Sequence, residues 1–435
     1  MGASRRILLV TYFYPPCTDT GAHRPSSMVK YLRRAGHDVT VLTTSAYGAL
    51  PDDEEQKIVR TADAQLWRAK LRGADHVGSM YDSDTYTGRP HPLSRVIVPE
   101  PLAVAWAPFA RRRARALHRA KSFDCVITTS PPESAHSVGR SLQHRGVAWL
   151  ADVRDAWNFE PLRPAFPTAT QRRMDERLER RMLGAADAVV CVSEPAARDL
   201  RDRGIADPVL VRNGADPELL QAADPAAVAT LLDPERVSLV YTGRFGSTGR
   251  DPGPLLEALA VLAVEHPADA AELELVVAGP LTEAEHEAFR HDVGPARISI
   301  AGSLERERAL ALQRAADALL LIAHPVRSQL ANFKLYEYLS AGPPVLALAA
   351  GTEAGTVVAS FGGTVIPAGD VGAIVDALRR TARRGLAASD PEARAEHSYP
   401  AVAERMAAAI EGALGRAREK SHAGGRTSRS GPPED

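Results

Sequence analysis

Short runs of consecutive apolar residues recur along the first half of the chain, separated by stretches with the periodicity of amphipathic helices. Runs that are apolar at successive positions are typical of parallel strands covered by helices on both faces. Five runs fit this pattern: 7–10, 39–42, 125–128, 149–151 and 188–192. They predict a doubly wound α/β domain.

The same pattern starts again in the second half of the chain. Its apolar runs cover 239–241, 273–278, 298–301, 318–322 and 345–348. Asn213-Gly214, between the two sets, is typical of a turn and places the boundary near residue 210. We expect one Rossmann-like domain over 1–210 and a second over 211–400.

Residues 45–95 and the residues after 400 lack the repeated apolar runs. Residues 45–95 are rich in Asp, Gly, Pro and Tyr and contain no convincing strand, so we expect an insertion into the first domain that carries specificity. Residues 401–416 have the pattern of an amphipathic helix, and the Ser, Gly, Pro and charged residues of 417–435 are typical of a disordered tail.

The charge and cysteine content narrow the class of protein. A formal net charge of −1 gives no general attraction to nucleic acid, which we do not expect as a partner. Cys125 and Cys191 lie within apolar runs and are expected to be reduced, which fits a cytoplasmic location. No apolar stretch approaches the ~18 residues that a membrane span requires.

Residues 106–123 are unusually basic. They contain five arginines and Lys121, with Phe109 and Leu117 among them. Such a segment suits peripheral contact with an anionic membrane at its inner face, and it equally suits a solvated basic helix.

Polar residues follow the predicted strands of the first half. Gly21 lies on the loop after the first strand, where helix amides can face an anion, although a simple turn explains it equally well. His136 follows the strand at 125–128, and Asp152, Arg154 and Asp155 follow the next strand. They are candidates for a ligand site at the carboxyl edge of the sheet; a structural histidine and an internal ion-pair network are the alternatives.

The second half places glycines and arginines on one loop. Gly243, Arg244 and Arg250 lie between the strand at 239–241 and the next helical pattern. Close backbone approach and fixed positive charge are what a diphosphate requires, although a solvated loop is the alternative. Residues 333–342 predict a short helix whose Glu337 carboxylate suits the paired hydroxyls of a ribose, or simply a solvated helix face.

The order of these motifs resembles the retaining glycosyltransferases of the GT-B fold, in family 4, over about residues 6–416. The likeness rests on 12–21, 130–136, 152–157, 192–194, 213–214, 243–250 and 334–342. It implies two Rossmann-like parallel-sheet domains that face each other across a cleft. It also implies that the helix over 401–416 packs back on the first domain.

The resemblance further implies a nucleoside-diphosphate sugar as donor, bound mainly by the second domain. The implied donor-binding residues are Gly21, Gly243, Arg244, Arg250, Gln329, Lys334, Leu335 and Glu337. Family members often carry a glutamate where this chain has Gln329, whose amide can hydrogen-bond but has no charge. Arg250 likewise stands where lysine is commoner.

Transfer with retention is the implied mechanism, without a metal or a cofactor. Arg244 and Arg250 would stabilise the departing diphosphate, and the leaving phosphate would take the acceptor proton. His136 and Asp155 complete the catalytic set, and Arg24, Asp152 and Arg154 would orient the sugar or acceptor. The acceptor hydroxyl belongs to an unidentified saccharide, lipid-linked saccharide or natural product. The alternatives are a nucleotide-sugar epimerase and a non-catalytic nucleotide-sugar-binding protein.

Overall fold

The chain divides into two units in a computed structural model. The structure describes residues 3–47, 50–71, 102–161, 166, 168–245, 249–290, 292–324, 326–331 and 333–427. Unit 1 comprises Met1–Arg212 and Val402–Asp435, and unit 2 comprises Asn213–Ala401. Each unit has a buried apolar core of its own.

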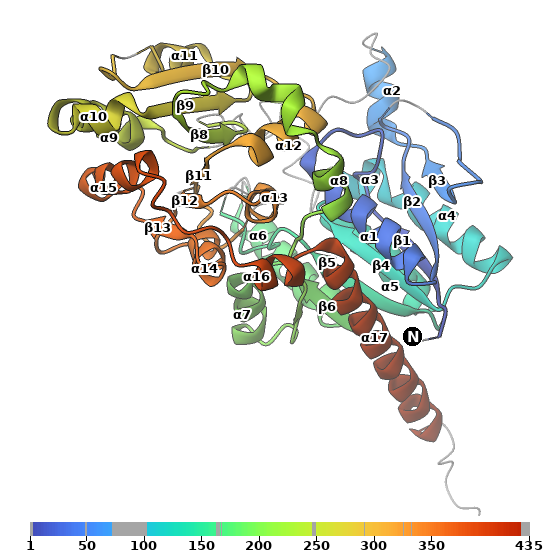
Figure 1. The fold of residues 1–435 in the computed structure, drawn as a ribbon. Coiled ribbons are helices and arrows are strands. Elements are labelled where there is room, and N and C mark those ends of the chain that lie inside the picture. The colour runs from blue at the N-terminus through green and yellow to red at the C-terminus, as the bar shows by residue number, and fades with distance from the viewer. Residues whose placement is uncertain are drawn as a thin grey trace, which may run out of the picture. The chain divides into compact units, whose positions relative to one another are not determined.

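Unit 1 is built on a seven-stranded parallel sheet (Figure 1). The strand order is β3 (Ile58–Thr61), β2 (Asp38–Thr44), β1 (Arg6–Val10), β4 (Cys125–Ser130), β5 (Ala148–Val153), β6 (Ala188–Cys191) and β7 (Val209–Leu210). Every residue of β4 and β5 is buried, because helices cover both faces of the sheet.

The helices of unit 1 connect these strands. They are α1 (His23–Arg34), α2 (Ala64–Leu71), α3 (Leu102–Ala105), α4 (Ala107–Ala120), α5 (His136–Gln143), α6 (Ala169–Leu183) and α7 (Glu194–Asp202). The short 3₁₀ turn η1 (Thr20–Ala22) precedes α1. Cys125 and Cys191 are buried free thiols, and burial raises the pKa of Cys191 to about 12.

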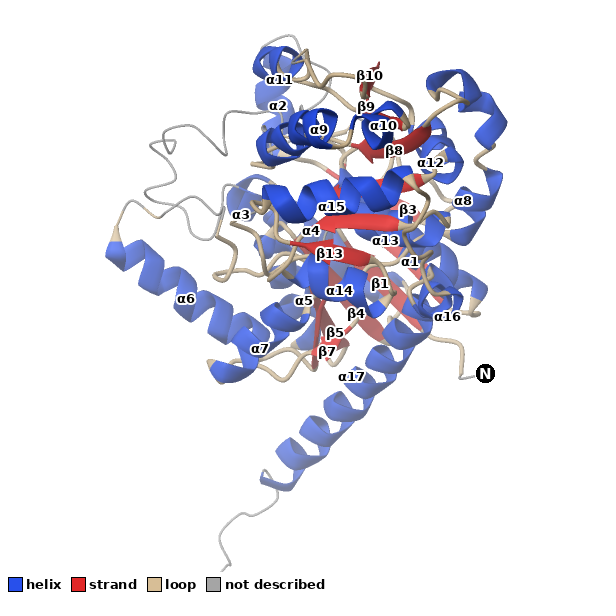
Figure 2. Ribbon diagram, turned by 60° about the vertical axis from the view of Figure 1, so that its left-hand side comes forward, coloured by secondary structure: helices blue, strands red, loops and turns tan. Residues whose placement is uncertain are grey.

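Unit 2 repeats the architecture with six parallel strands. Their order is β10 (Arg297–Gly302), β9 (Leu273–Ala278), β8 (Val237–Thr242), β11 (Ala318–Ile322), β12 (Val345–Leu348) and β13 (Thr364–Ile366). Its helices are α8 (Pro217–Ala222), α9 (Gly253–Glu265), α10 (Pro267–Ala271), α11 (Glu283–Ala288), α12 (Arg306–Ala315), α13 (Phe333–Ala341), α14 (Glu353–Ser360), α15 (Val371–Ala382) and α16 (Pro391–Glu396). α14 packs against β12 and β13 (Figure 2). The prediction of two doubly wound parallel-sheet domains is confirmed.

The prediction that 45–95 contains no strand is wrong. β3 lies within this segment and pairs in parallel with β2, from Val41 opposite Ile58 to Thr44 opposite Thr61. Only Ile58 and Val59 mark it in the sequence, because an edge strand needs few apolar residues. Elsewhere in the predicted insertion, α2 occupies 64–71, and 48–49 and 72–95 lie outside the described residues.

The C-terminal helix is longer than the sequence suggests. α17 (Tyr399–Thr427) continues past residue 416, so the expected disordered tail from 417 is wrong as far as Thr427, and 428–435 lie outside the described residues. The part of α17 from Val402 belongs to unit 1. Arg5 forms a bidentate ion pair with Glu411 at 2.7 and 2.8 Å, and Lys420 Nζ pairs with Asp187 Oδ1 at 2.8 Å.

Candidate functional site

The strand order of unit 2 reverses between β8 and β11. β9 and β10 extend the sheet on one side of β8, and β11, β12 and β13 extend it on the other. Ligands of open parallel sheets bind outside the carboxyl ends of the strands at such a reversal, because the loops leaving the two strands diverge there. The loop after β8 and the segment between β11 and α13 both start at this edge.

Two basic side chains are held at this edge through main-chain carbonyls. Lys334, in the first turn of α13, donates from Nζ to the carbonyl oxygen of Thr242, the last residue of β8, at 2.7 Å. Arg250 donates from Nε to the carbonyl oxygen of Ile322, the last residue of β11, at 3.0 Å. Two predicted donor residues are therefore brought to neighbouring strand ends.

Two glycines of the loop after β8 leave room for the side chains of Lys334 and His324. Gly243 has φ +121°, and a Cβ there would lie 3.2 Å from Lys334 Nζ. Gly249 has φ +75°, and a Cβ there would lie 2.5 Å from His324 Nε2. Positive φ strains other residues, so both positions favour glycine for backbone and packing reasons. Residues 246–248 lie outside the described part of the loop.

The surroundings of Lys334 make its positive charge costly. Burial, reinforced by the charge of Arg250, lowers the pKa of Lys334 well below its usual value, and Glu337 opposes this effect. Lys334 Nζ also lies 3.9 Å from the centroid of the Tyr241 ring, which favours a cation. A bound anion would relieve the repulsion between the two basic groups.

Glu337 lies one helical turn after Lys334 on α13 and is buried. Its Oε1 accepts a hydrogen bond from Arg306, at the start of α12, at 2.6 Å. Burial raises the pKa of Glu337, whereas the charges of Arg306 and Lys334 act in the opposite direction. Arg306 was not among the predicted site residues, since 31 positions separate the pair and no local motif connects them.

The remaining predicted donor residues differ in exposure. Gln329 is buried on the segment between β11 and α13, and Arg244 is exposed. The Leu335 side chain is fully buried in the core of unit 2, so any contact with a donor would involve its backbone. His324, two residues after β11, was missed, although it follows a strand end as the predicted residues do.

Unit 1 has its own reversal of strand order, between β1 and β4. Arg154 connects the loops that leave these two strands. It donates from Nε to the carbonyl oxygen of Ser130 at 2.9 Å, from Nη2 to that of Pro131 at 3.2 Å, and from Nη1 to that of Gly21. Its contacts therefore fix the backbone around Gly21 rather than leave the guanidinium for a ligand.

Arg24 and Asp152 form an internal ion pair. Arg24 donates to both carboxylate oxygens of Asp152, at 3.1 and 2.9 Å, and both side chains are almost fully buried. Arg24 also donates to the carbonyl oxygens of Val211 and Arg212, each at 3.0 Å. Asp152 is therefore in an internal ion pair, as the alternative reading of the sequence held, but its partner here is Arg24, which that alternative did not include. Acceptor orientation by these residues stays a prediction.

His136 is fully buried at the start of α5. Its Nδ1 lies 2.8 Å from Thr128 Oγ1, which also accepts a hydrogen bond from Trp149 Nε1 at 2.8 Å. Burial lowers the pKa of His136 to about 4, so the imidazole is neutral at pH 7. Its Nε2 has no hydrogen-bond partner among the described residues and can serve a ligand only as a neutral group.

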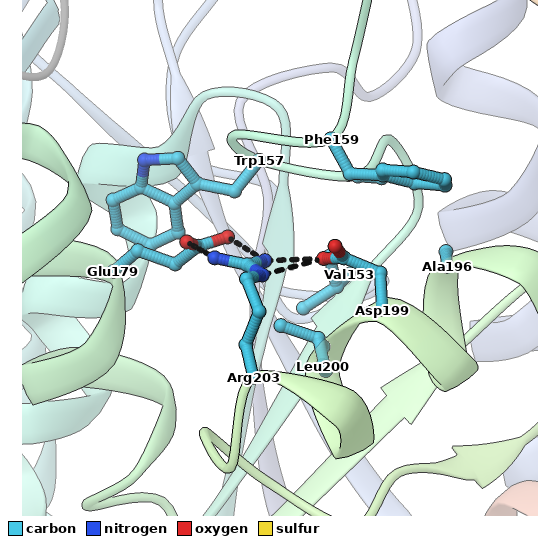
Figure 3. A pocket seen from close by; sticks show the side chains of 9 residues that line it. Val153, Trp157, Phe159, Glu179, Ala196, Asp199, Leu200 and Arg203 are labelled. Carbon is cyan, nitrogen blue, oxygen red and sulfur yellow. Dashed lines mark hydrogen bonds and ion pairs between the residues drawn. The ribbon is translucent and has the colours of Figure 1, made fainter. Parts of the chain in front are cut away.

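Asp155 is half-buried on a loop that α6 holds in place. On this loop, Trp157 donates to Asp175 at 3.1 Å and Asn158 donates from Nδ2 to Glu179 at 3.0 Å. Arg203 bridges Glu179 and Asp199 below Trp157 (Figure 3). The cavity among these side chains measures about 10 Å³, room for about one water and not for a sugar.

Neither a metal centre nor a membrane span is found among the described residues. No three His, Cys, Asp or Glu side chains gather there as metal ligands would. No described helix is both long and apolar enough to cross a bilayer.

Several solved structures share this fold. Sucrose-phosphate synthase from Thermosynechococcus elongatus has 18% identity and a TM-score of 0.62, over 93% of this chain and 97% of its own. HepE from Anabaena, solved with UDP, has 13% identity and a TM-score of 0.57, over 94% and 99%. An α,α-trehalose-phosphate synthase from Burkholderia vietnamiensis has 13% identity and a TM-score of 0.55, over 98% and 100%.

Family models identify both halves of the chain, although no curated protein matches it. Residues 21–214 match the glycosyl transferase 4-like domain, and residues 236–384 match the glycosyl transferases group 1 domain. The two matches lie in the same order as the two α/β units and together span most of the sequence. The chain therefore belongs to the group 1 glycosyltransferases of the GT-B fold.

Proposed function

We propose that the protein transfers a sugar from a nucleoside-diphosphate sugar to a hydroxyl acceptor, with retention at the anomeric carbon and without a metal. The placement of Arg250 and Lys334 at the ends of two neighbouring strands, with Glu337 one turn further along α13, carries this proposal. Two cations beside one carboxylate match a diphosphate followed by a ribose.

The transfer step would depend on basic side chains that are already positioned at the leaving diphosphate. As the bond between the anomeric carbon and the diphosphate breaks, negative charge grows on the leaving phosphate. Arg250 and a reprotonated Lys334 would stabilise that charge without a metal, and Arg244 would add to it from the exposed part of the loop. The leaving phosphate would accept the acceptor proton, and His136 and Asp155 would orient the sugar or acceptor by hydrogen bonds.

UDP is the first nucleotide to test, because HepE of the same fold was solved with it. The family matches favour transfer over the nucleotide-sugar epimerase alternative. We place the enzyme in the cytoplasm. Peripheral membrane contact through residues 106–123 is part of the proposal, because a lipid-linked acceptor would be met at a bilayer surface.

Thermal unfolding with UDP, GDP, dTDP and ADP tests the donor site. A nucleotide at about 100 times its dissociation constant should add about 2.7 kcal/mol to the free energy of unfolding. Arg250→Ala and Glu337→Gln should reduce that gain. Arg308→Gln, an exposed charge on α12, is the matched control. If none of the four nucleotides stabilises the protein, the donor site is wrong.

Product analysis tests the reaction itself. With the sugar of the stabilising nucleotide and a panel of hydroxyl acceptors, NMR of the new glycosidic bond should show the anomeric configuration of the donor. EDTA should leave the rate unchanged. An inverted product, or loss of activity that Mg²⁺ restores, would contradict the proposed mechanism. Conversion of the donor without any acceptor would instead favour an epimerase.

A further inference from the structure

The outward face of α4 carries arginines without acidic partners. Arg111, Arg115 and Arg119 repeat every four residues, and Arg112 is exposed beside them. No described carboxylate pairs with any of these four. Two other cations of the segment are paired, Arg113 with Asp52 at 2.6 Å and Lys121 with Asp38 at 2.7 Å.

The arginines on this face are close enough to repel one another. Arg111, Arg119 and Arg145 each add their charge to burial in lowering the pKa of Arg115. Arg145 follows α5, which packs against α4. Arg115 Nε is also buried without a hydrogen-bond partner among the described residues. Unpaired like charges destabilise a fold, and an anionic partner would relieve that cost.

An exposed aromatic group borders the same face. The Trp67 side chain on α2 is 56% exposed, although tryptophan is usually buried. Its ring meets that of Phe109 on α4 edge to face, with 5.9 Å between centroids. Phe109 precedes Arg112 by three positions, so these two side chains are neighbours on α4 and the aromatic pair borders the arginines at Arg112. Val104, on α3 just before α4, is 60% exposed.

We propose that this surface, which we call the α4 face and define by Trp67, Phe109, Arg112, Arg115 and Arg119, docks the protein on an anionic lipid bilayer. Arginines bind lipid phosphates while their alkyl stems lie along apolar surface, and tryptophan favours the interface between headgroups and acyl chains. A nucleic acid or another soluble polyanion would use the arginines but leave the aromatic pair in water. The combination therefore favours a membrane.

This docking site deepens the peripheral contact proposed above and uses no residue of the nucleotide site. Each arginine close to an anionic membrane contributes about fivefold to the partition coefficient, so the three arginines of the α4 face give strong but salt-sensitive binding. Insertion of Trp67 adds an apolar contribution to the binding free energy, and salt does not screen this contribution. UDP stabilisation and bilayer binding can be measured separately on one preparation.

The tryptophans provide a direct readout. Trp106, Trp149 and Trp157 are at most 2% exposed, so Trp67 is the only one of the four that faces solvent. Titration of the full chain with vesicles of phosphatidylcholine and phosphatidylglycerol in equal parts should shift the emission to the blue. Vesicles of phosphatidylcholine alone should produce little change.

Matched variants separate the electrostatic contribution of the arginines from the apolar contribution of Trp67. Co-sedimentation with vesicles is the measurement. Arg112→Gln with Arg119→Gln should weaken binding to the anionic vesicles about thirtyfold. Arg308→Gln with Arg380→Gln removes two exposed arginines from unit 2 and should have no effect. Trp67→Ser should abolish the binding that persists at high salt, whereas Val264→Ser, at an 82% exposed site on α9, should not.

The proposal is overturned if the emission does not shift with anionic vesicles, or if the α4 variants bind as tightly as their controls. Binding to heparin or duplex DNA without a shift on vesicles would assign the arginines to a soluble polyanion, and it would overturn membrane docking as well. UDP stabilisation unchanged in every variant would show that the variants remain folded.

Discussion

Lys334 is a buried amine whose positive charge a bound anion would restore. Its lowered pKa means that the free protein holds this amine with less than its usual share of protons. A diphosphate would raise that pKa, so binding of UDP should take up protons at pH values above the lowered pKa, and the affinity should fall as the pH rises through this range.

Calorimetry in buffers of different ionisation enthalpy measures this proton uptake. Lys334→Met, which keeps the apolar stem, should abolish the uptake and weaken UDP binding. Proton uptake that is the same in Lys334→Met and in the parent would assign the titration to another group.

Arg306 acts on the nucleotide site through Glu337. Without Arg306, only Lys334 and Gln313 would oppose the effect of burial, so the pKa of Glu337 would rise further and the carboxyl would be protonated over a wider pH range. We expect Arg306→Gln to weaken UDP binding most between the Glu337 pKa of the parent and the higher pKa of the variant, where only the variant is protonated, and Arg306→Lys to restore part of the loss. The readout is the affinity for UDP as a function of pH. A uniform loss at every pH would mean that Arg306 has a structural role only.

His136 links stability to pH. Its pKa is about 4 in the folded protein and about 6.5 when unfolded, so the unfolded chain binds the extra proton between these values. Stability should therefore fall as the pH drops from about 6.5 to about 4, by on the order of 3 kcal/mol from this group. Urea unfolding of the parent and of His136→Gln isolates the effect, because the variant should lack this part of the pH dependence.

At the scale of elements, Asp187 connects α17 to the sheet of unit 1. Its buried Oδ2 accepts from Trp149 N at 2.9 Å and Gln143 Nε2 at 3.0 Å, its Oδ1 pairs with Lys420, and its carbonyl oxygen accepts from Arg416. Asp187→Ala removes the acceptor of the Trp149 amide and one of the two acceptors of Gln143 Nε2, and it should cost about 3 kcal/mol in urea unfolding. Lys420→Ala should cost less than about 1 kcal/mol, because this ammonium is half exposed. Equal losses for both variants would contradict this order.

Most strands that the sequence predicted correctly have apolar runs that are buried on both faces; β10, a sheet edge without a buried residue, is the exception. β12 lies at the predicted residues 345–348, and all four are buried. The missed strands are short or at a sheet edge: β7 has two residues and β13 has three. Such strands are stabilised by pairing with a neighbour rather than by their own apolar content, so the sequence pattern is too weak to show them.

In the candidate site, too, some residues could be predicted from the sequence and others could not. Residues directly after strands, such as Arg250, could be predicted because the carboxyl edge of a parallel sheet follows from topology. The partners of these residues could not be predicted. The pairing of Arg306 with Glu337 and of Arg24 with Asp152 joins residues far apart in sequence, and only the packing of the folded chain brings them together.

At the scale of the whole molecule, the chain consists of two units with separate cores. The core around Leu8 and Trp149 contains only residues of unit 1, and the cores around Leu239 and Leu335 contain only residues of unit 2. Arg250, Lys334 and Glu337 all lie in unit 2. A nucleotide without its sugar should therefore stabilise the two units unequally.

Hydrogen exchange with and without UDP measures this inequality. Protection should concentrate in the loop after β8 and in the first turns of α13, because ligand binding suppresses local opening where the contacts form. Amides of β4 and β5 in unit 1 should exchange at nearly unchanged rates. Arg250→Ala should remove the protection in unit 2, whereas Arg308→Gln should retain it. If UDP instead protects the segment around Gly21 and His136 and leaves α13 unchanged, the nucleotide belongs to unit 1, and the assignment of Arg250, Lys334 and Glu337 to the donor fails.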